Sequence, residues 1–262
     1  MKQDIKPIKS TVLRMGAVLS IALVLGACSD NDDSSSMDGD DPMAAVSDDS
    51  MMALPAAFDV MVTNITAGQP ISPILVGLHS DAYKSFSTGS PASVSLENLA
   101  ESGDNSSLMS DWNAADAVYT TASGNGVIVP GDNETVTLEL DQGDLTSSGG
   151  LSISVLTMLV NTNDAIAALN SQALASMEVG DSQSFTALTY DSGTEANSET
   201  AESIPGPAGG GEGYNATRDD LRDEVYVHAG VVTASDGLAT STLSQIHKWD
   251  HPGVRISVTR IQ

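Results

Sequence analysis

The nine residues from Phe58 to Thr66, FDVMVTNIT, decide how the chain is interpreted. Apolar side chains recur at every second position, namely at Phe58, Val60 and Val62. Successive side chains of a β-strand point to opposite faces, so a period of two predicts a strand with one face in the core. The opposite face then carries Asp59, Met61 and Thr63.

Further stretches with strand character follow, divided by turns rich in Gly, Asn and Asp. They occupy residues 72–80, 117–121, 134–141, 151–160, 165–171, 184–191, 224–232 and 253–261. The last alternates strongly, with Val254, Ile256, Val258 and Ile261 expected in the core. Eight or nine strands at this spacing predict a single all-β domain, an antiparallel β-sandwich over residues 56–262.

One segment changes period. Ser90-Pro91 is a helix start signal, and Gly103 is a stop signal. Between them Val94, Leu96, Leu99 and Ala100 recur at helical spacing. We therefore expect one short helix in the domain, with these four side chains on its buried side.

The N-terminus reads as an export signal over residues 1–27. Four basic residues precede an apolar run, Met15–Leu25, of about eleven residues, too short for the roughly 20 that cross a bilayer. The run closes on Leu25-Gly26-Ala27-Cys28, which resembles the lipobox of bacterial lipoproteins. By that resemblance Cys28, the only cysteine, carries the acyl groups that anchor the protein, and Ser29 after it favours sorting to the outer membrane.

The charge is strongly acidic. The chain carries 10 basic and 35 acidic residues, a net −25, and without residues 1–27 (four basic, one acidic) it carries 6 against 34, or −28. Residues 28–55 hold eight Asp and no basic residue, which is typical of an acidic, disordered linker. Such a charge excludes nucleic acid and heparin-like polyanions as expected partners and favours cations.

Carboxylates stand where two strands end. Asp164 follows the strand of 151–160 and its turn, and Asp191 and Glu195 follow that of 184–191. Between residues 85 and 217 there are eighteen Asp and Glu but no Lys, Arg or His. Neighbouring strands of a sandwich can bring such loops together, and Ca²⁺ takes six to eight oxygen ligands in a tolerant geometry. These residues are candidate calcium ligands, although Asp at a strand end is also ordinary turn chemistry.

Two other functions stay open at this point. Asp164 and Asp191 could serve a carbohydrate-active hydrolase as general acid and base, or the domain could be a ligand-binding module without metal. Against catalysis, the chain has no Gly-x-Ser-x-Gly, no His-Glu-x-x-His and no cysteine beyond Cys28. His247 and His251 are four apart, but a proline follows, so we expect loop histidines and no zinc site.

The chain resembles the spondin N-terminal domain, in its bacterial lipoprotein branch, over roughly residues 58–261. The resemblance is carried by VTNITAGQPISPILVGLHS (62–80), GSPASVSLENLAESGDNSSL (89–108), TNDAIAALNS (162–171), DSGTEANSE (191–199) and HPGVRISVTRI (251–261). It implies a C2-like β-sandwich that binds one calcium ion through Asp164, Asp191 and Glu195. TNDA replaces the family's Ser-Pro-Asp-Trp, Glu195 stands where animal members have Asp, and their cysteines are absent.

Taken together, these observations predict a non-catalytic lipoprotein of the bacterial cell envelope, anchored by lipid in the outer membrane. Its calcium-binding domain is expected to serve adhesion or scaffolding toward an unknown protein or glycan. The heparin binding of animal relatives should not carry over, because residues 56–262 carry 26 acidic and 6 basic residues, a net −20.

Overall fold

A computed structural model describes residues 54–146, 150–220, 222–250 and 252–262. The predicted export signal, the lipidation at Cys28 and the linker up to residue 53 lie outside the described residues. Within the described part of the chain, no helix is long and apolar enough to cross a membrane.

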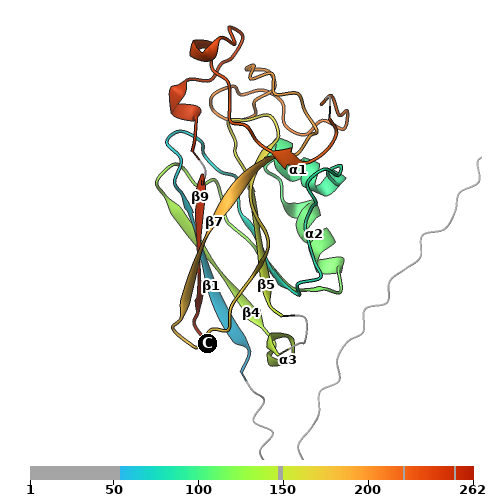
Figure 1. The fold of residues 1–262 in the computed structure, drawn as a ribbon, viewed down its shortest axis with the longest axis vertical. Coiled ribbons are helices and arrows are strands. Elements are labelled where there is room, and N and C mark those ends of the chain that lie inside the picture. Colours follow the sequence, from blue (N-terminus) through green and yellow to red (C-terminus); the bar gives the residue numbers. More distant parts are fainter. Residues whose placement is uncertain (1–53, 147–149, 221, 251) are drawn as a thin grey trace, which may run out of the picture. The chain divides into compact units, whose positions relative to one another are not determined.

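The described domain is built on one antiparallel sheet of nine strands (Figure 1). The strands are β1 Ala56–Asn64, β2 Leu75–His79, β3 Val118–Ser123, β4 Asn133–Leu140, β5 Ser152–Met158, β6 Ala165–Ala173, β7 Ser182–Asp191, β8 Tyr226–Val227 and β9 Val254–Arg260. Their order is β3-β2-β5-β6-β7-β9-β1-β4, with β8 paired to β7. The sheet is nearly closed, and the prediction of an all-β fold is confirmed.

Strand β7 is shared by the two halves of the sheet. Its first part, Ser182 to Ala187, pairs with β9. Its second part, from Leu188 to Asp191, pairs with β6. Each half of the sheet therefore depends on hydrogen bonds to the same strand.

The core lies between these halves. Alternate residues of β1 are buried as predicted, with Phe58, Val60 and Val62 at most 1% exposed. They pack with apolar residues of β2, β4, β5, β6 and β9 in one cluster. Burial of this apolar area is the main stabilising term of the domain.

Two helices cover the outer face of β2, β5 and β6. These are α1, Val94–Ser102, and α2, Ser106–Ala114. Leu96 and Leu99 of α1 and Trp112 of α2 pack in a second cluster with apolar residues of those strands. Strands β2 and β5 are consequently buried on both faces.

Helix α1 begins at Val94, a few residues after the predicted start signal Ser90-Pro91, and it ends at Gly103 as predicted. The Leu96 N–H donates to the Ser93 hydroxyl at 3.2 Å, which caps the first turn. Gly103 ends the helix with φ +74°, a left-handed conformation that glycine adopts without a Cβ penalty. The predicted helix is therefore present, but Val94, expected on its buried side, is 60% exposed.

Three further expectations were wrong. The domain holds α2 and a short α3, Gln142–Leu145, besides α1, where a single helix was predicted. The strand predicted over 224–232 is reduced to the two residues of β8. Ile261, expected in the core, is 45% exposed because β9 ends at Arg260.

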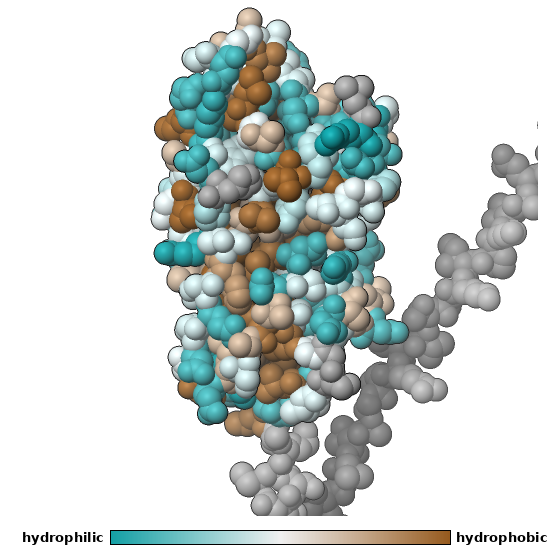
Figure 2. Space-filling model, in the orientation of Figure 1, coloured by the Kyte–Doolittle hydropathy of each residue, from teal (hydrophilic) through white to brown (hydrophobic). Residues whose placement is uncertain are grey.

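The surface carries scattered apolar residues. On the face shown in Figure 2, hydrophobic residues lie among hydrophilic ones. The exposed large side chains include Leu188, Val227 and Ile246. Isolated apolar residues are normal on a protein surface and by themselves indicate no binding surface.

Candidate metal centre

The pairing of β6 with β7 places Asp164 beside the end of β7. Ala165, the first residue of β6, is opposite Asp191, the last residue of β7. The next pair is closed by the Ser192 N–H, which donates to the Asp164 carbonyl at 3.2 Å. Both Asp side chains are buried, with 0% exposure. The expected meeting of these two carboxylates is therefore found.

Asp164 is held rigidly through one carboxylate oxygen. Its Oδ2 accepts hydrogen bonds from the Thr194 N–H at 2.8 Å, the Ser192 hydroxyl at 2.9 Å, the Glu195 N–H at 3.1 Å and the Thr194 hydroxyl at 3.2 Å. Its Oδ1 is buried and has no hydrogen-bond partner among the described residues. One oxygen is thus fully used for positioning and the other is left for a ligand.

The turn after β7 depends on Gly193. Its φ is +70°, and a Cβ there would lie 2.2 Å from the Glu224 carbonyl oxygen. Only glycine fits this approach. The Gly193 N–H donates to Asp191 Oδ1 at 3.0 Å, and the Asn197 side chain donates to Asp191 Oδ2 at 2.5 Å. The same turn therefore positions Asp191 and supplies the donors to Asp164.

The third member of the cluster is Asp220. Asp164, Asp191 and Asp220 each offer a carboxylate oxygen, and these three oxygens lie within 4.8 Å of one another. Asp220 is half-buried, and it accepts from the Arg222 N–H at 2.9 Å and from the Tyr226 hydroxyl at 3.4 Å. This residue was not predicted, because it lies on an irregular segment before β8 that carries no periodicity.

The segment that carries Asp220 is fixed at both ends. Arg218 donates to Glu97 Oε2 at 2.9 Å and to the Ala92 carbonyl at 2.7 Å. The Asp219 N–H donates to the Thr194 carbonyl at 3.2 Å. On the far side the Val225 N–H donates to the Ser90 carbonyl at 2.9 Å. Asp220 is therefore held against the sheet by contacts of its segment with α1, with the residues that precede α1, and with the turn that contains Gly193.

Glu195, the third ligand expected from the sequence, is not in this group of three. Its backbone N–H binds Asp164, and the charges acting on its carboxylate are those of Glu101, Asp164 and Asp219. Burial, followed by those charges, raises the pKa of Glu195 to about 8. The side chain is nearly buried, at 8% exposure, so it forms a neighbouring acidic position.

Burial and a neighbouring charge both disfavour the ionised form of Asp164. Burial and then the Asp191 charge raise the pKa of Asp164 to about 7, against the opposing effect of its hydrogen-bond donors. Among the described residues, no Lys or Arg forms an ion pair with any of the three Asp. A cation bound here would relieve this repulsion.

His228 borders the cluster without offering a ligand atom. The Gly230 N–H donates to His228 Nδ1 at 2.9 Å, so in the neutral ring Nε2 carries the proton. Nε2 lies 4.0 Å from Asp191 Oδ2. The atoms of this cluster that could bind a metal ion are therefore carboxylate oxygens, which suit hard cations such as Ca²⁺ or Mg²⁺.

The other histidines considered from the sequence form no cluster here. His247 ends a 3₁₀ turn, Gln245–His247, and its Nδ1 accepts from the Ser244 N–H at 3.0 Å. His251 lies outside the described residues. Among the described residues, the three Asp are the one group of carboxylates or histidines whose ligand atoms lie close enough together to hold a metal ion.

Comparison with known proteins gave no matching family model and no matching curated protein.

Proposed function

We propose that this domain binds one Ca²⁺ through Asp164, Asp191 and Asp220. The observation that carries the proposal is the asymmetry of Asp164, whose Oδ2 has four donors while its buried Oδ1 has none among the described residues. Leaving a buried charged oxygen unpaired costs several kcal/mol, so a bound cation is the simplest partner. Glu195 positions Asp164 through its backbone in this arrangement.

Calcium is favoured over other divalent ions by the ligand set. Zinc prefers nitrogen and sulfur ligands. The nearby His228 accepts a hydrogen bond from the Gly230 N–H at Nδ1, so its Nε2 carries the proton in the neutral ring and cannot bind a metal ion. Calcium accepts carboxylates together with backbone carbonyls and waters at 2.3–2.6 Å. Three carboxylates on three separate segments supply the charge, and waters complete the coordination.

The role of the ion is structural and the domain is non-catalytic in this proposal. Asp164 and Asp191 are both 0% exposed, so a glycan cannot reach them as it would reach a general acid and base. The hydrolase alternative is therefore disfavoured. The ion joins β6, β7 and the segment before β8, which stabilises the loops at this end of the sheet.

We extend the proposal to the setting of the domain. The resemblance to the spondin N-terminal domain supports a C2-like sandwich, and the nearly closed antiparallel sheet is compatible with it. The lipobox-like Leu25–Cys28 supports a lipoprotein of the cell envelope that presents this domain for adhesion or scaffolding. A protein or glycan ligand is the proposed partner.

Calorimetric titration tests the metal. The wild-type chain should bind calcium with a Kd in the range of about 10⁻⁴–10⁻³ M that is common for extracellular sites. Asp220→Asn should weaken binding by at least about tenfold, because it removes one of three charged ligands. Asp181→Asn is the matched control: Asp181 is exposed and accepts a hydrogen bond from the Glu178 N–H, so calcium binding should be unchanged. Equal affinities in wild type and Asp220→Asn would contradict the assignment.

Cell fractionation tests the anchor. Cys28→Ala removes the only thiol that could be acylated, so the protein should no longer appear as an acylated band in membranes. If the variant still fractionates as a mature-sized acylated protein, the lipoprotein proposal is wrong.

A further inference from the structure

A pocket of about 390 Å³ opens at the end of the sheet that is opposite to the three clustered Asp. Asp164 directly precedes the first residue of β6, whereas Leu174 on the pocket wall directly follows its last residue. The pocket and the three Asp are therefore separated by the length of that strand. In Figure 1, α3 and the C-terminus lie at the lower end of the domain, and α1 lies near the upper end. The larger side chains of the wall are Phe58, Leu145, Leu151, Leu174, Met177 and Arg260.

The pocket is continuous with the apolar interior of the sheet. Phe58 and Met177 belong to the main core cluster and are 1% and 6% exposed. Leu145, Leu151 and Leu174 are half-buried and pack against that cluster. Ligand sites are typically concave and mostly apolar, with volumes of about 300–1,000 Å³, and the open ends of rolled sheets are common places for them. The position, the lining and the volume of this pocket all match that description.

Arg260 supplies one charged group on this apolar wall. Its Nη1 donates to the Met177 carbonyl at 2.7 Å, and its Nε donates to the Gln262 backbone oxygen at 3.0 Å. Two of the three nitrogen atoms are therefore used to fix the guanidinium in place. Its Nη2 donates no hydrogen bond to any described residue. A charged donor is thus held at the pocket with capacity for a further acceptor.

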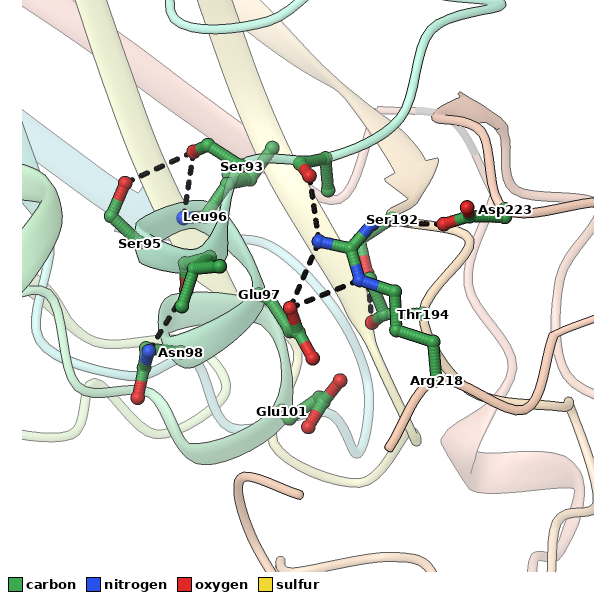
Figure 3. A network of polar contacts seen from close by, with 12 residues as sticks. Ser93, Ser95, Leu96, Glu97, Asn98, Glu101, Ser192, Thr194, Arg218 and Asp223 are labelled. Carbon is green, nitrogen blue, oxygen red and sulfur yellow. Dashed lines mark hydrogen bonds and ion pairs between the residues drawn. The ribbon is translucent and has the colours of Figure 1, made fainter. Parts of the chain in front are cut away.

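Arg260 differs from Arg218 in its partners. Arg218 pairs with the carboxylates of Glu97 and Asp223 (Figure 3). Within the described ranges no Asp or Glu side chain forms an ion pair with Arg260. The domain over residues 56–262 has a net charge of −20, so acidic partners are abundant elsewhere in it. A guanidinium binds a carboxylate through charge-assisted hydrogen bonds, and a carboxylate from outside the chain would fit here.

We propose that this pocket binds a medium-chain alkanoate, with its hydrocarbon chain against Phe58 and the three leucines and its carboxylate on Arg260. At about 30 Å³ for a group the size of a water molecule, the pocket holds about a dozen such groups. A straight carboxylate of about six to ten carbons has this size. The site needs no metal ion, so the inference is independent of the proposed calcium site.

A ligand series on the full wild-type chain tests the pocket, with octanoate as the first probe in calorimetric titration. Octanoate has about ten non-hydrogen atoms, so its Kd should be about 1 mM or tighter. From hexanoate to decanoate each added methylene should tighten binding about fourfold, because it buries more apolar surface. 1-Octanol and octylammonium should bind at least about tenfold more weakly than octanoate, because neither offers a charged acceptor.

Two outcomes of the series would overturn the proposal. One is the absence of binding up to about 10 mM octanoate, which is too weak for a ligand that fills the pocket. The other is octanoate that binds no more tightly than 1-octanol, which would show that Arg260 does not recognise a carboxylate.

A pair of arginine variants locates the carboxylate. Arg260→Gln should weaken octanoate binding at least about tenfold and leave the affinity for 1-octanol unchanged, because only the charged contact is lost. Arg255→Gln is the matched control: Arg255 lies on the same strand, is exposed and is not part of this pocket, so octanoate binding should be unchanged. Equal octanoate affinity in Arg260→Gln and wild type would overturn the assignment. Should Arg260→Gln not fold, as judged by circular dichroism, the wild-type ligand series decides.

Titration in EDTA separates this site from the proposed calcium site. The octanoate Kd should be the same in EDTA and in calcium, and the same in Asp191→Asn as in wild type. If the chain binds octanoate but not calcium, the pocket stands and the proposed function fails; if it binds calcium but not octanoate, the reverse holds. Octanoate binding that requires calcium would place the ligand elsewhere and overturn the pocket.

Discussion

The interior of the sheet and its acidic end are stabilised in opposite ways. The interior is made of apolar side chains, such as Val60, Leu78 and Ile256, which are fully buried and need no partner of opposite charge. The acidic end buries Asp164, Asp191, Glu97 and Glu101, each at most 2% exposed. Burial stabilises the apolar side chains of the interior, whereas it destabilises the ionised form of the carboxylates at the acidic end.

This difference predicts which part of the domain is sensitive to pH and to bound ions. Hydrophobic packing depends little on pH or on ions, whereas a buried group of carboxylates depends on both. Calcium and protons should therefore bind at the acidic end, and the cost of a substitution in the apolar interior should not depend on either.

The largest effect is expected in the interior. Leu78→Ala should lower the free energy of unfolding by about 2–5 kcal/mol, because it leaves a cavity in a site that is 0% exposed. Urea denaturation with and without calcium should show the same loss in both conditions. Leu188→Ala is the matched control: Leu188 is 47% exposed, so the loss should stay near 0.5 kcal/mol. If calcium restored the stability lost in Leu78→Ala, the interior and the acidic end would not be stabilised independently.

The next largest effect is the stabilisation expected when calcium binds at the acidic end. At a hundredfold excess of calcium over Kd, one site should stabilise the native state by about 2.7 kcal/mol, which raises the Tm by several degrees. Asp191→Asn should remove most of that gain, because Asp191 is one of the three clustered carboxylates. Its stability without calcium should be equal to wild type or higher, since a repulsive charge is gone. An equal gain from calcium in both proteins would show that the three carboxylates bind no ion.

A smaller effect is expected from pH. The folded-state pKa values are raised to about 7 at Asp164, about 8 at Glu195 and about 7 at Glu199, mainly by burial. In this pH range the folded state then binds more protons than the unfolded state at these three groups, so their contribution to stability without calcium falls as pH rises from about 5 to 8.

Urea denaturation in EDTA at several pH values should show a fall of at least about 1.4 kcal/mol, the equivalent of one pKa unit. Calcium should weaken or reverse the trend, because it replaces the protons. A profile in EDTA that is flat from pH 5 to 8 would contradict the raised pKa values.

The smallest effect is expected at a helix cap. Ser93→Ala should lower the free energy of unfolding by about 1 kcal/mol, because the Leu96 N–H loses its acceptor. The loss should be the same with and without calcium in thermal denaturation. Ser110→Ala, at an exposed position inside α2, should cause no loss and serves as the control.

Most strands could be predicted from the sequence because their two faces differ in polarity. The alternation at Phe58, Val60 and Val62 has its counterpart in the burial of β1. The helix α2 could not be predicted in the same way, since Leu108 and Trp112 are its only fully buried side chains and no start signal stands out before it. Strand β8 pairs only with the end of β7, so its length depends on tertiary contacts that the pattern does not show.

The candidate metal centre was predictable in part. Asp164 directly precedes β6 and Asp191 ends β7, and these two strands pair with each other, so position along the chain was enough to bring the two residues together. Asp220 lies 29 residues beyond Asp191, and the contact of Arg218 with Glu97 of α1 brings it to the cluster. The burial of Glu97 and Glu101 was also missed, because charged residues on a helix normally face water and only Arg218 and Asn215 explain their position.

Sharing β7 between the two halves of the sheet has a consequence for how the domain opens. Amide hydrogens exchange with solvent when a local element separates, and separate halves of a sheet often do so at different rates. Here neither half can separate without breaking hydrogen bonds to β7, which pairs with β9 over its first residues and with β6 over its last. Exchange should therefore be slow along the whole strand and should report the opening of both halves at once. An ion held by Asp191, at the end of that strand, acts on the entire domain.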